Sequence, residues 1–173
     1  MKKFLKLGLM LFFGIGSVFA QTDKAVTSKI IAAKNFIFVA TTANPLNSTD
    51  VNNILRQMPG NANGGSIDLS GNYYDVQITP DSIVAYLPYY GRAFSAPINP
   101  DENGYKFKSK NFSYSTTPRK KGGWEILMIT KDVKDSPRLS LSISENGYAT
   151  LNIISNNKQS ISYNGYLEES KRK

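Results

Sequence analysis

The sequence contains neither cysteine nor histidine among its 173 residues. These two absences exclude a Ser-His-Asp triad, a Cys-His dyad, a zinc site built from the usual ligands, a histidine general base and a histidine pH switch. Without cysteine the chain can form no disulfide and can carry no lipid on a thiol, so its core alone must hold it together. Carboxylate pairs, a lysine or tyrosine base and a calcium site remain, and the sequence names no activity.

Long apolar runs are also scarce, and the one that is present lies at the N-terminus. Residues 1–20 combine three lysines, the run LGLMLFFGIGSV and a final FA, which are the three parts of a secretory signal peptide. Val18 and Ala20 supply the small residues that a signal peptidase requires, so we expect cleavage after Ala20. A retained anchor is the alternative, although the run is short for a membrane span. We therefore expect an exported protein, periplasmic or extracellular, with no membrane span once the signal is removed.

The chain beyond the signal, residues 21–173, has the size of one domain with one sizeable core. Three of the 21 basic residues lie in the signal, which leaves 18 against 13 acidic residues and a formal charge of +5. That moderate excess suits either contact with an anionic envelope surface or polysaccharide, or a basic surface that is simply solvated. No nucleic-acid partner is expected, because the chain is exported and lacks a stacking motif of the RNA-binding type.

Helical patterns are confined to the first part of the mature chain. Residues 21–34 are predicted to form a short amphipathic helix, because Val26, Ile30 and Ile31 recur near helical spacing. A second helix of one or two turns is expected within residues 48–58, where a capping residue precedes apolar residues at helical spacing. The Gly- and Asn-rich stretch that follows favours an irregular loop.

Period-two alternation dominates residues 35–168, which we predict to be a single β-rich domain followed by a basic tail at 169–173. Leu139, Leu141 and Ile143, for example, alternate strictly with serines. About eight or nine strands joined by short turns predict an antiparallel meander, because parallel crossovers need a dozen or more residues. The fold class is therefore mainly β, α+β at most. A barrel-like sheet and a two-layer sheet would both protect the edges, and the pattern does not choose between them.

Two local patterns make more specific predictions. The strands expected in GSIDLSG and YYDVQIT are separated by a Gly-Asn pair, which is a hairpin signal. The stretch GYKFKSKNFSYS is predicted as one strand with Lys106, Lys108 and Lys110 on one face and aromatic residues on the other. This lysine row is interpreted as a solvated face or as protection of an edge strand against aggregation.

Two stretches connect the chain to a family. YLPYYGRAFSAP with the lysine-rich strand after it, and ENGYATLNIISNNKQSISYNGYL, resemble the secreted Bacteroidetes proteins grouped as domain of unknown function 4251. The resemblance covers residues 34–168. It implies an export signal followed by one β-rich domain. It implies no activity, ligand, cofactor or catalytic residue.

The densest cluster of aromatic, proline and glycine residues is AYLPYYGRAFSAP. Its proline cannot donate to a sheet ladder and its glycine tolerates a bulge, so we expect the strand to run at an edge or to bend there. Tyrosine and arginine are enriched in binding hot spots. The predicted ligand or partner contacts are Tyr89, Tyr90, Arg92 and Phe94, with Trp124 as a candidate neighbour. In the alternative interpretation, two of the aromatic rings fill a barrel end or sheet corner and Arg92 lies over one of them.

Three function classes stay open. The leading hypothesis is a non-catalytic exported domain, without cofactor or metal, that binds an unidentified ligand or an envelope protein. A carboxylate-dependent glycan hydrolase would need two acidic side chains about 5 to 9.5 Å apart in one cleft. An inhibitor or assembly factor would instead present an exposed apolar patch. The stretch NPDENGYKF offers oxygen ligands but lacks EF-hand spacing, and it is interpreted as a turn.

Overall fold

The computed structural model describes residues 24–46, 65–94 and 104–170. The expected signal at 1–20 and the expected helix within 48–58 lie outside the described residues, as does the end of the basic tail. In the described part of the chain, no helix is long and apolar enough to cross a membrane.

The predicted N-terminal helix is present as α1, Lys24–Ala32. Thr27, Ile30 and Ile31 are its buried residues, whereas Val26 is 37% exposed. The buried positions follow the i, i+3, i+4 spacing of one helix face. Val26 stands one position ahead of that stripe, so the prediction that it faces the core was wrong.

In the described part of the chain, ten strands follow the helix. In chain order they are β1 Phe36–Pro45, β2 Ile67–Asp68, β3 Asp75–Ile78, β4 Ile83–Pro88, β5 Gly104–Ser109, β6 Phe112–Pro118, β7 Trp124–Thr130, β8 Arg138–Ile143, β9 Tyr148–Ile154 and β10 Ile161–Glu169. Nine of them form the order β5-β4-β3-β1-β10-β9-β8-β7-β6, and β2 pairs with β1 beside this path. Every pair is antiparallel, which confirms the predicted mainly β meander.

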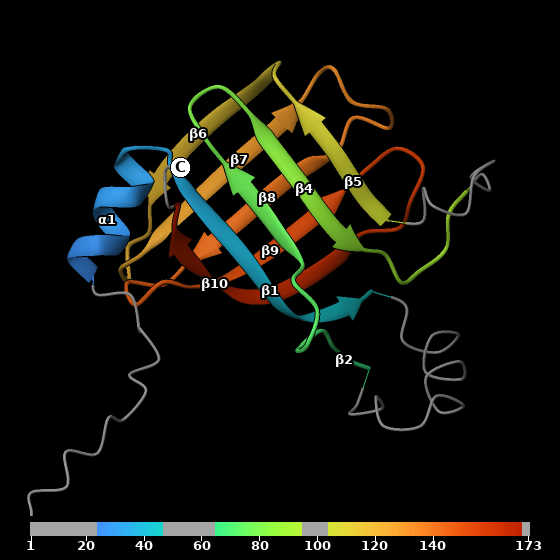
Figure 1. Cartoon of the computed structure of the whole chain (residues 1–173), viewed down its shortest axis with the longest axis horizontal. Coiled ribbons are helices and arrows are strands. Elements are labelled where there is room, and N and C mark those ends of the chain that lie inside the picture. Colours follow the sequence, from blue (N-terminus) through green and yellow to red (C-terminus); the bar gives the residue numbers. More distant parts are fainter. Residues whose placement is uncertain (1–23, 47–64, 95–103, 171–173) are drawn as a thin grey trace, which may run out of the picture.

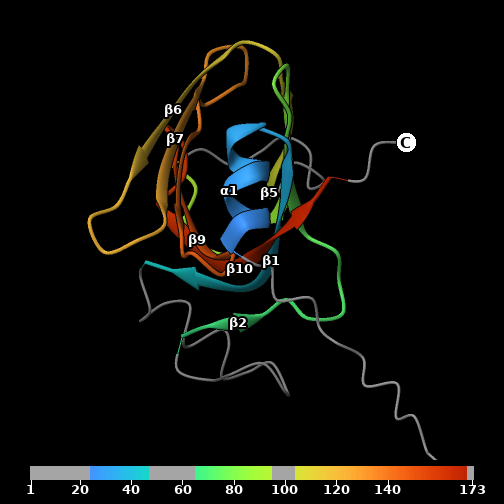
Figure 2. The same cartoon turned by 90° about the vertical axis from the view of Figure 1, so that its left-hand side faces the viewer.

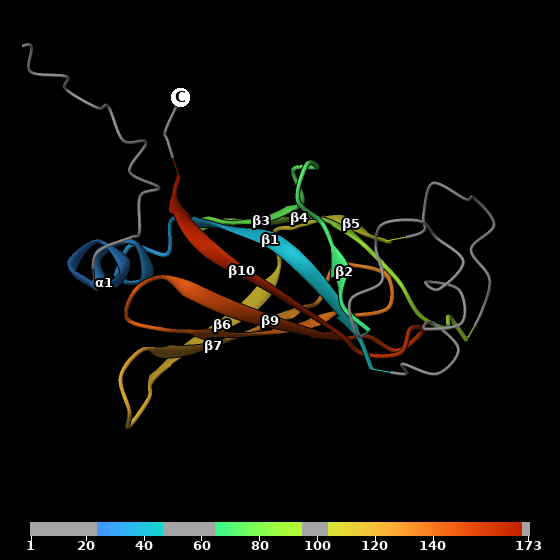
Figure 3. The same ribbon diagram turned by 90° about the horizontal axis from the view of Figure 1, so that it is seen from below.

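The sheet curls into a nearly closed barrel (Figure 1). The first and last long strands, β1 and β10, pair along their whole lengths and close one side of it. On the other side β5 and β6 end the path and do not pair with each other, although they follow one another in sequence. Figure 2 shows α1 lying across one end of the barrel. In Figure 3, β3, β4 and β5 form one wall and β7 and β9 the opposite wall, with β1 and β10 between them.

Two predictions of local strand pairing were wrong. β2 pairs with β1 rather than with β3, so the Gly-Asn pair does not join two partnered strands. The stretch predicted as one lysine-rich strand is two strands, β5 and β6, with a corner at Lys110 and Asn111. At this corner Asp132 accepts hydrogen bonds from the backbone N–H groups of Lys110, at 2.8 Å, and Asn111, at 3.0 Å. A carboxylate from a distant loop thus breaks an alternation that continues through the sequence.

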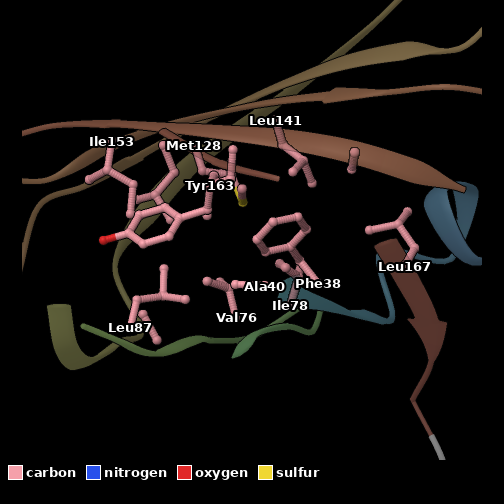
Figure 4. Packing of buried hydrophobic residues seen from close by; sticks show 14 of the residues in the cluster. Phe38, Ala40, Val76, Ile78, Leu87, Met128, Leu141, Ile153, Tyr163 and Leu167 are labelled. Carbon is pink, nitrogen blue, oxygen red and sulfur yellow. The ribbon is translucent and has the colours of Figure 1, made fainter. Parts of the chain in front are cut away.

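The core fills the barrel with buried residues from the long strands other than β6, whose Phe112 and Tyr114 are only partly buried against it. Phe36 and Phe38 of β1 and Tyr163 of β10 are fully buried at its centre. Figure 4 shows the two walls of the barrel facing each other across the core. Val76, Ile78 and Leu87 of β3 and β4 lie on one side, and Met128, Leu141 and Ile153 of β7, β8 and β9 lie on the other. The serine-alternating strand β8 behaves as predicted, because its three apolar side chains are completely buried. Each large apolar side chain buried in this way contributes about 1.5 to 3 kcal/mol.

β10 passes close to β1 at Gly165, which is opposite Ala40. A Cβ at Gly165 would collide with the carbonyl oxygen of Val39. The register between β1 and β10 shifts between Ala40 and Thr42, as it does at a β-bulge. Only glycine leaves enough room for the strand that closes the barrel.

Candidate functional site

The predicted contact segment leaves the barrel at the end of β4, away from α1 (Figure 1). β4 lies between β3 and β5 and is not an edge strand, so of the two expected alternatives the structure shows the bend, with the chain leaving the sheet after Pro88. Pro88 is tolerated because it lies beyond the β3 ladder, whose last pair is Asp75 with Tyr86. On its other side Pro88 pairs with Gly104, and the buried hydroxyl of Tyr163 donates a hydrogen bond to the Pro88 carbonyl at 2.6 Å.

Residues 89–94 then fold onto the connection between β9 and β10. The N–H of Phe94 donates to the carbonyl of Asn157 at 2.8 Å, and the N–H of Gln159 donates to the carbonyl of Arg92 at 3.1 Å. Between these two bonds, Ala93 and Lys158 form an isolated antiparallel bridge. Backbone hydrogen bonds therefore fasten this segment to a turn that comes much later in the chain.

Tyr89 serves the closure of the fold. Its hydroxyl lies 2.8 Å from the carbonyl oxygen of Arg92 and 3.1 Å from that of Gln159. Its ring meets the ring of Tyr105 edge to face, with centroids 5.8 Å apart. Burial, with a smaller contribution from Tyr105, raises the pKa of Tyr89 to about 12. For this residue the structure favours the fold-closing interpretation.

The other members of the predicted cluster are less enclosed. Tyr90 packs against the edge of the core, and burial together with the nearby Tyr74 raises its pKa. Arg92 is exposed, and Phe94 is 72% exposed. An apolar ring that stays in solvent beside an arginine is a surface suited to contact with a partner.

Trp124 does not lie beside the tyrosine cluster. It begins β7 and, with Ser28, Ile31 and Lys34, lines a shallow hollow against α1. That hollow is at the helix-covered end of the barrel, whereas Tyr89 follows the far end of β4 (Figure 1). The candidate residues from the sequence therefore divide between two ends of the molecule.

A groove of about 490 Å³ opens along β5, and we call it the β5 groove. Its walls are β5, the β7–β8 connection and the β9–β10 connection. It is lined by Gly104, Tyr105, Lys106, Phe107, Lys108, Asp132, Val133, Lys134, Asp135, Pro137, Ser155 and Lys158. Lys158 also pairs with Ala93, so the groove adjoins the predicted contact segment.

The free edge of β5 carries outward backbone groups that can be assigned from the ladder. In the β3–β4 hairpin the N–H of Thr79 bonds to the carbonyl of Ser82, and hydrogen-bonded pairs alternate along an antiparallel ladder. The alternation directs the backbone groups of Ile83 and every second residue after it toward β5. On β5, the N–H and C=O groups of Lys106 and Lys108 consequently point away from β4. In the part of the chain that the structure describes, no hydrogen bond occupies these outward groups.

Lys158 closes one end of this edge. Its Nζ donates to the carbonyl oxygen of Gly104 at 2.6 Å. The same ammonium lies 4.9 Å from the ring centroid of Tyr105 and 5.4 Å from that of Tyr89. The cation over these rings, which the sequence-based alternative assigned to Arg92, is supplied by Lys158.

Asp132 closes the other end. Besides the backbone N–H groups at the corner, it accepts a hydrogen bond from the hydroxyl of Ser109. The Ser109 hydroxyl first, and then the N–H of Lys110, lower the pKa of Asp132, so its carboxylate is charged over the ordinary pH range. Its charge is directed at the corner of the strand rather than at the open part of the groove.

The two faces of β5 differ in chemistry along the groove. Lys106 and Lys108 are exposed on the outer face. Tyr105 is buried and Phe107 is partly buried on the inner face. Burial raises the pKa of Tyr105, so its phenol stays neutral. The free edge therefore runs between a cationic surface and an aromatic one.

Comparison with known proteins identifies the family. The chain matches the family described as Domain of unknown function (DUF4251) over residues 20–167. The chain belongs to the DUF4251 family. It is also similar to the crystal structure of a DUF4251 family protein from Bacteroides eggerthii, with a TM-score of 0.56 and 15% identity over 84% of this chain and 87% of that chain. At that identity the likeness shows the fold alone, and no curated protein matches this chain.

In this DUF4251 domain, the resemblance seen in YLPYYGRAFSAP is confirmed as family membership. The sequence did not reveal that Tyr105 and Lys158 are the partners of Tyr89, because barrel closure brings together segments far apart in the chain. The sequence did contain one indication of the groove, the lysine row of β5, because that row lies on the edge strand beside it.

Proposed function

We propose that this DUF4251 domain is an exported, non-catalytic binding protein whose ligand lies in the β5 groove. The observation that supports this best is the free edge of β5, with unpartnered backbone groups at Lys106 and Lys108 among the described residues, placed inside a groove. Arg92 and Phe94, on the segment fastened to Lys158, are proposed as outer contacts. Export is supported by the signal-like composition of residues 1–20.

Binding is favoured over glycan hydrolysis by the state of Asp132, one of the two acidic residues that line the β5 groove. A glycosidase needs a carboxylic acid whose pKa is raised, so that it can protonate the leaving group. In the β5 groove the opposite holds for Asp132, whose pKa is lowered and whose oxygens accept bonds from Ser109, Lys110 and Asn111. The Asp132 carboxylate therefore stabilises the corner between β5 and β6 through these hydrogen bonds.

Site-specific photo-crosslinking in the producing bacterium tests the proposal. Benzoylphenylalanine is introduced in place of Lys134, which lines the groove, and separately in place of Lys120, which is exposed in the β6–β7 turn. Irradiation should yield an adduct from position 134 and none from position 120, because the ligand is expected only at the groove. The adducts are detected by immunoblot and identified by mass spectrometry. Export and folding of both chains with no adduct at position 134 would contradict the proposal.

A further inference from the structure

We infer that the occupant of the β5 groove is a polypeptide, which adds an extended segment with alternating apolar and acidic side chains to the edge of β5. This inference rests on the proposed function and names its ligand class. Addition of a strand to an exposed sheet edge is a general mode of peptide recognition, in which backbone bonds supply affinity and alternate side chains supply specificity.

The backbone of β5 defines where the added strand would bind. Lys106 and Lys108 each direct one N–H and one C=O away from β4, with one residue between them. This is the repeat of hydrogen-bonding groups with which the next strand of a sheet pairs. The groove lies along these groups, so an added strand would lie within it.

The two ends of the edge limit the length of the added strand. The Gly104 carbonyl already accepts a hydrogen bond from Lys158, and the Lys110 N–H already donates to Asp132. Backbone pairing is therefore available only between these two side chains. Five residues, 105–109, lie in this interval, so at about 3.3 Å per residue it accommodates an added strand of about five residues in register.

The two faces of β5 determine the side chains that fit. Residues of an added strand that point to the inner face would meet Tyr105 and Phe107, which favours apolar side chains. Residues on the outer face would lie beside Lys106 and Lys108, which favours carboxylates. Charge complementarity thus selects an alternating apolar and acidic segment.

A second copy of this chain fits the edge less well than an acidic partner. Pairing of β5 with β5 would place the exposed lysines of one copy opposite those of the other, and like charges across a strand pair are destabilising. Lysines at an edge also prevent pairing with uncharged strands. The same two residues therefore reject self-association and accept an acidic strand.

Peptide binding is measured by fluorescence anisotropy with the labelled hexapeptide Val-Glu-Val-Glu-Val-Glu, capped at both ends, and with its Val-Lys counterpart. The acidic peptide should bind at least about tenfold more tightly at low salt, and added salt should weaken it. The variant Lys106→Glu/Lys108→Glu should reverse the preference. The matched variant Lys120→Glu/Lys121→Glu, which changes the same charge in the β6–β7 turn, should keep it.

Backbone N-methylation separates strand addition from simple charge attraction. Methylating either the Glu or the Val nitrogens removes N–H groups from only one edge of the peptide strand. Affinity should fall at least about tenfold for one of the two methylated peptides and stay within about twofold for the other. Equal affinities of the two methylated peptides would overturn the inference.

Two further outcomes also count against it. If Lys106→Thr/Lys108→Thr associates in sedimentation velocity while the parent chain binds no acidic peptide, the lysines only protect the edge, and the inference is overturned. If photo-crosslinking at position 134 captures a glycan or lipid, the proposed binding function stands and the peptide inference fails. A crosslinked polypeptide whose attached segment alternates apolar and acidic residues supports both.

Discussion

The Nζ of Lys158 lies 2.6 Å from the carbonyl oxygen of Gly104, and this contact ties the β9–β10 connection to the first residue of β5. Gly104 has no room for a side chain, because a Cβ there would lie 2.7 Å from the Leu87 carbonyl oxygen. The edge strand therefore begins at a position that a glycine and a distant lysine define together. The Tyr89 and Tyr105 rings beneath the ammonium complete the junction.

Removal of this ammonium should destabilise the fold. Lys158→Met keeps the length of the side chain but loses the bond to Gly104 and the contacts with two rings, so we expect a loss of about 1 to 3 kcal/mol in the free energy of unfolding. Urea denaturation followed by circular dichroism measures it. Lys120→Met, at an exposed turn position, should stay within about 0.5 kcal/mol. Equal stabilities of the two variants would contradict a structural role for Lys158.

The corner between β5 and β6 should be sensitive to acid through Asp132. Its pKa in the folded protein is lowered, first by the Ser109 hydroxyl and then by the Lys110 N–H, so the carboxylate stabilises the fold above its ordinary pKa of 3.8. This contribution is lost as the pH falls through the lower folded-state pKa. The urea midpoint of the parent chain should exceed that of Asp132→Asn at pH 6, and the gap should shrink below about pH 4. Asp81→Asn, in the β3–β4 turn, serves as the control, and a pH-independent gap for Asp132→Asn would refute the assignment.

Closure of the barrel should depend on the absence of a side chain at Gly165. A Cβ there meets the Val39 carbonyl oxygen on the paired strand, so Gly165→Ala should cost at least about 2 kcal/mol through overpacking. Gly71→Ala is the matched comparison, because no atom lies within 4 Å of its added Cβ and only its φ of 100° opposes alanine. Its cost should be about 1 kcal/mol. Thermal denaturation of the two variants distinguishes crowding from backbone strain, and a smaller loss at Gly165 would argue against close approach of β1 and β10.

The hydroxyl of Tyr163 should stabilise the end of β4. It is buried and donates to the Pro88 carbonyl at 2.6 Å, and burial raises its pKa well above the ordinary value. Tyr163→Phe keeps the ring and leaves that carbonyl unsatisfied, with an expected loss of about 1 to 3 kcal/mol. Tyr148→Phe, at a 60% exposed position, should change little. Comparable effects of the two substitutions in urea denaturation would show that the buried hydrogen bond contributes nothing.

Binding and stability should separate within the segment of residues 89–94. Phe94 is 72% exposed, so Phe94→Ser should leave the free energy of unfolding within about 0.5 kcal/mol while reducing the photo-crosslinking yield at position 134. Tyr89→Phe should instead lower the free energy of unfolding and leave the crosslinking yield of the folded protein unchanged, because the Tyr89 hydroxyl contacts the carbonyl oxygens of Arg92 and Gln159. An unchanged yield in Phe94→Ser would remove Phe94 from the proposed contact surface.

Local patterning accounts for much of the fold. Leu139, Leu141 and Ile143 alternate with serine and are all buried. The side chains of a strand alternate between its two faces regardless of which elements pack against it, so this pattern could be predicted locally. The helix was predicted in the right place for a similar reason, with Val26 as the error. The corner at Lys110 could not be predicted, since the alternation continues through it and the deciding hydrogen bonds come from Asp132.

By itself, the sequence determined the chemistry that is excluded, the mainly β class, the family and the lysine row of β5. Tertiary structure decided that the sheet nearly closes, that β5 is an edge strand among the described residues, and that Trp124 lies at the other end of the barrel from Tyr89. It also decided that Lys158, rather than Arg92, lies over the rings of Tyr89 and Tyr105. The physical reason is that periodicity reports which face of an element is buried, whereas strand order and barrel closure depend on contacts between residues far apart in the chain.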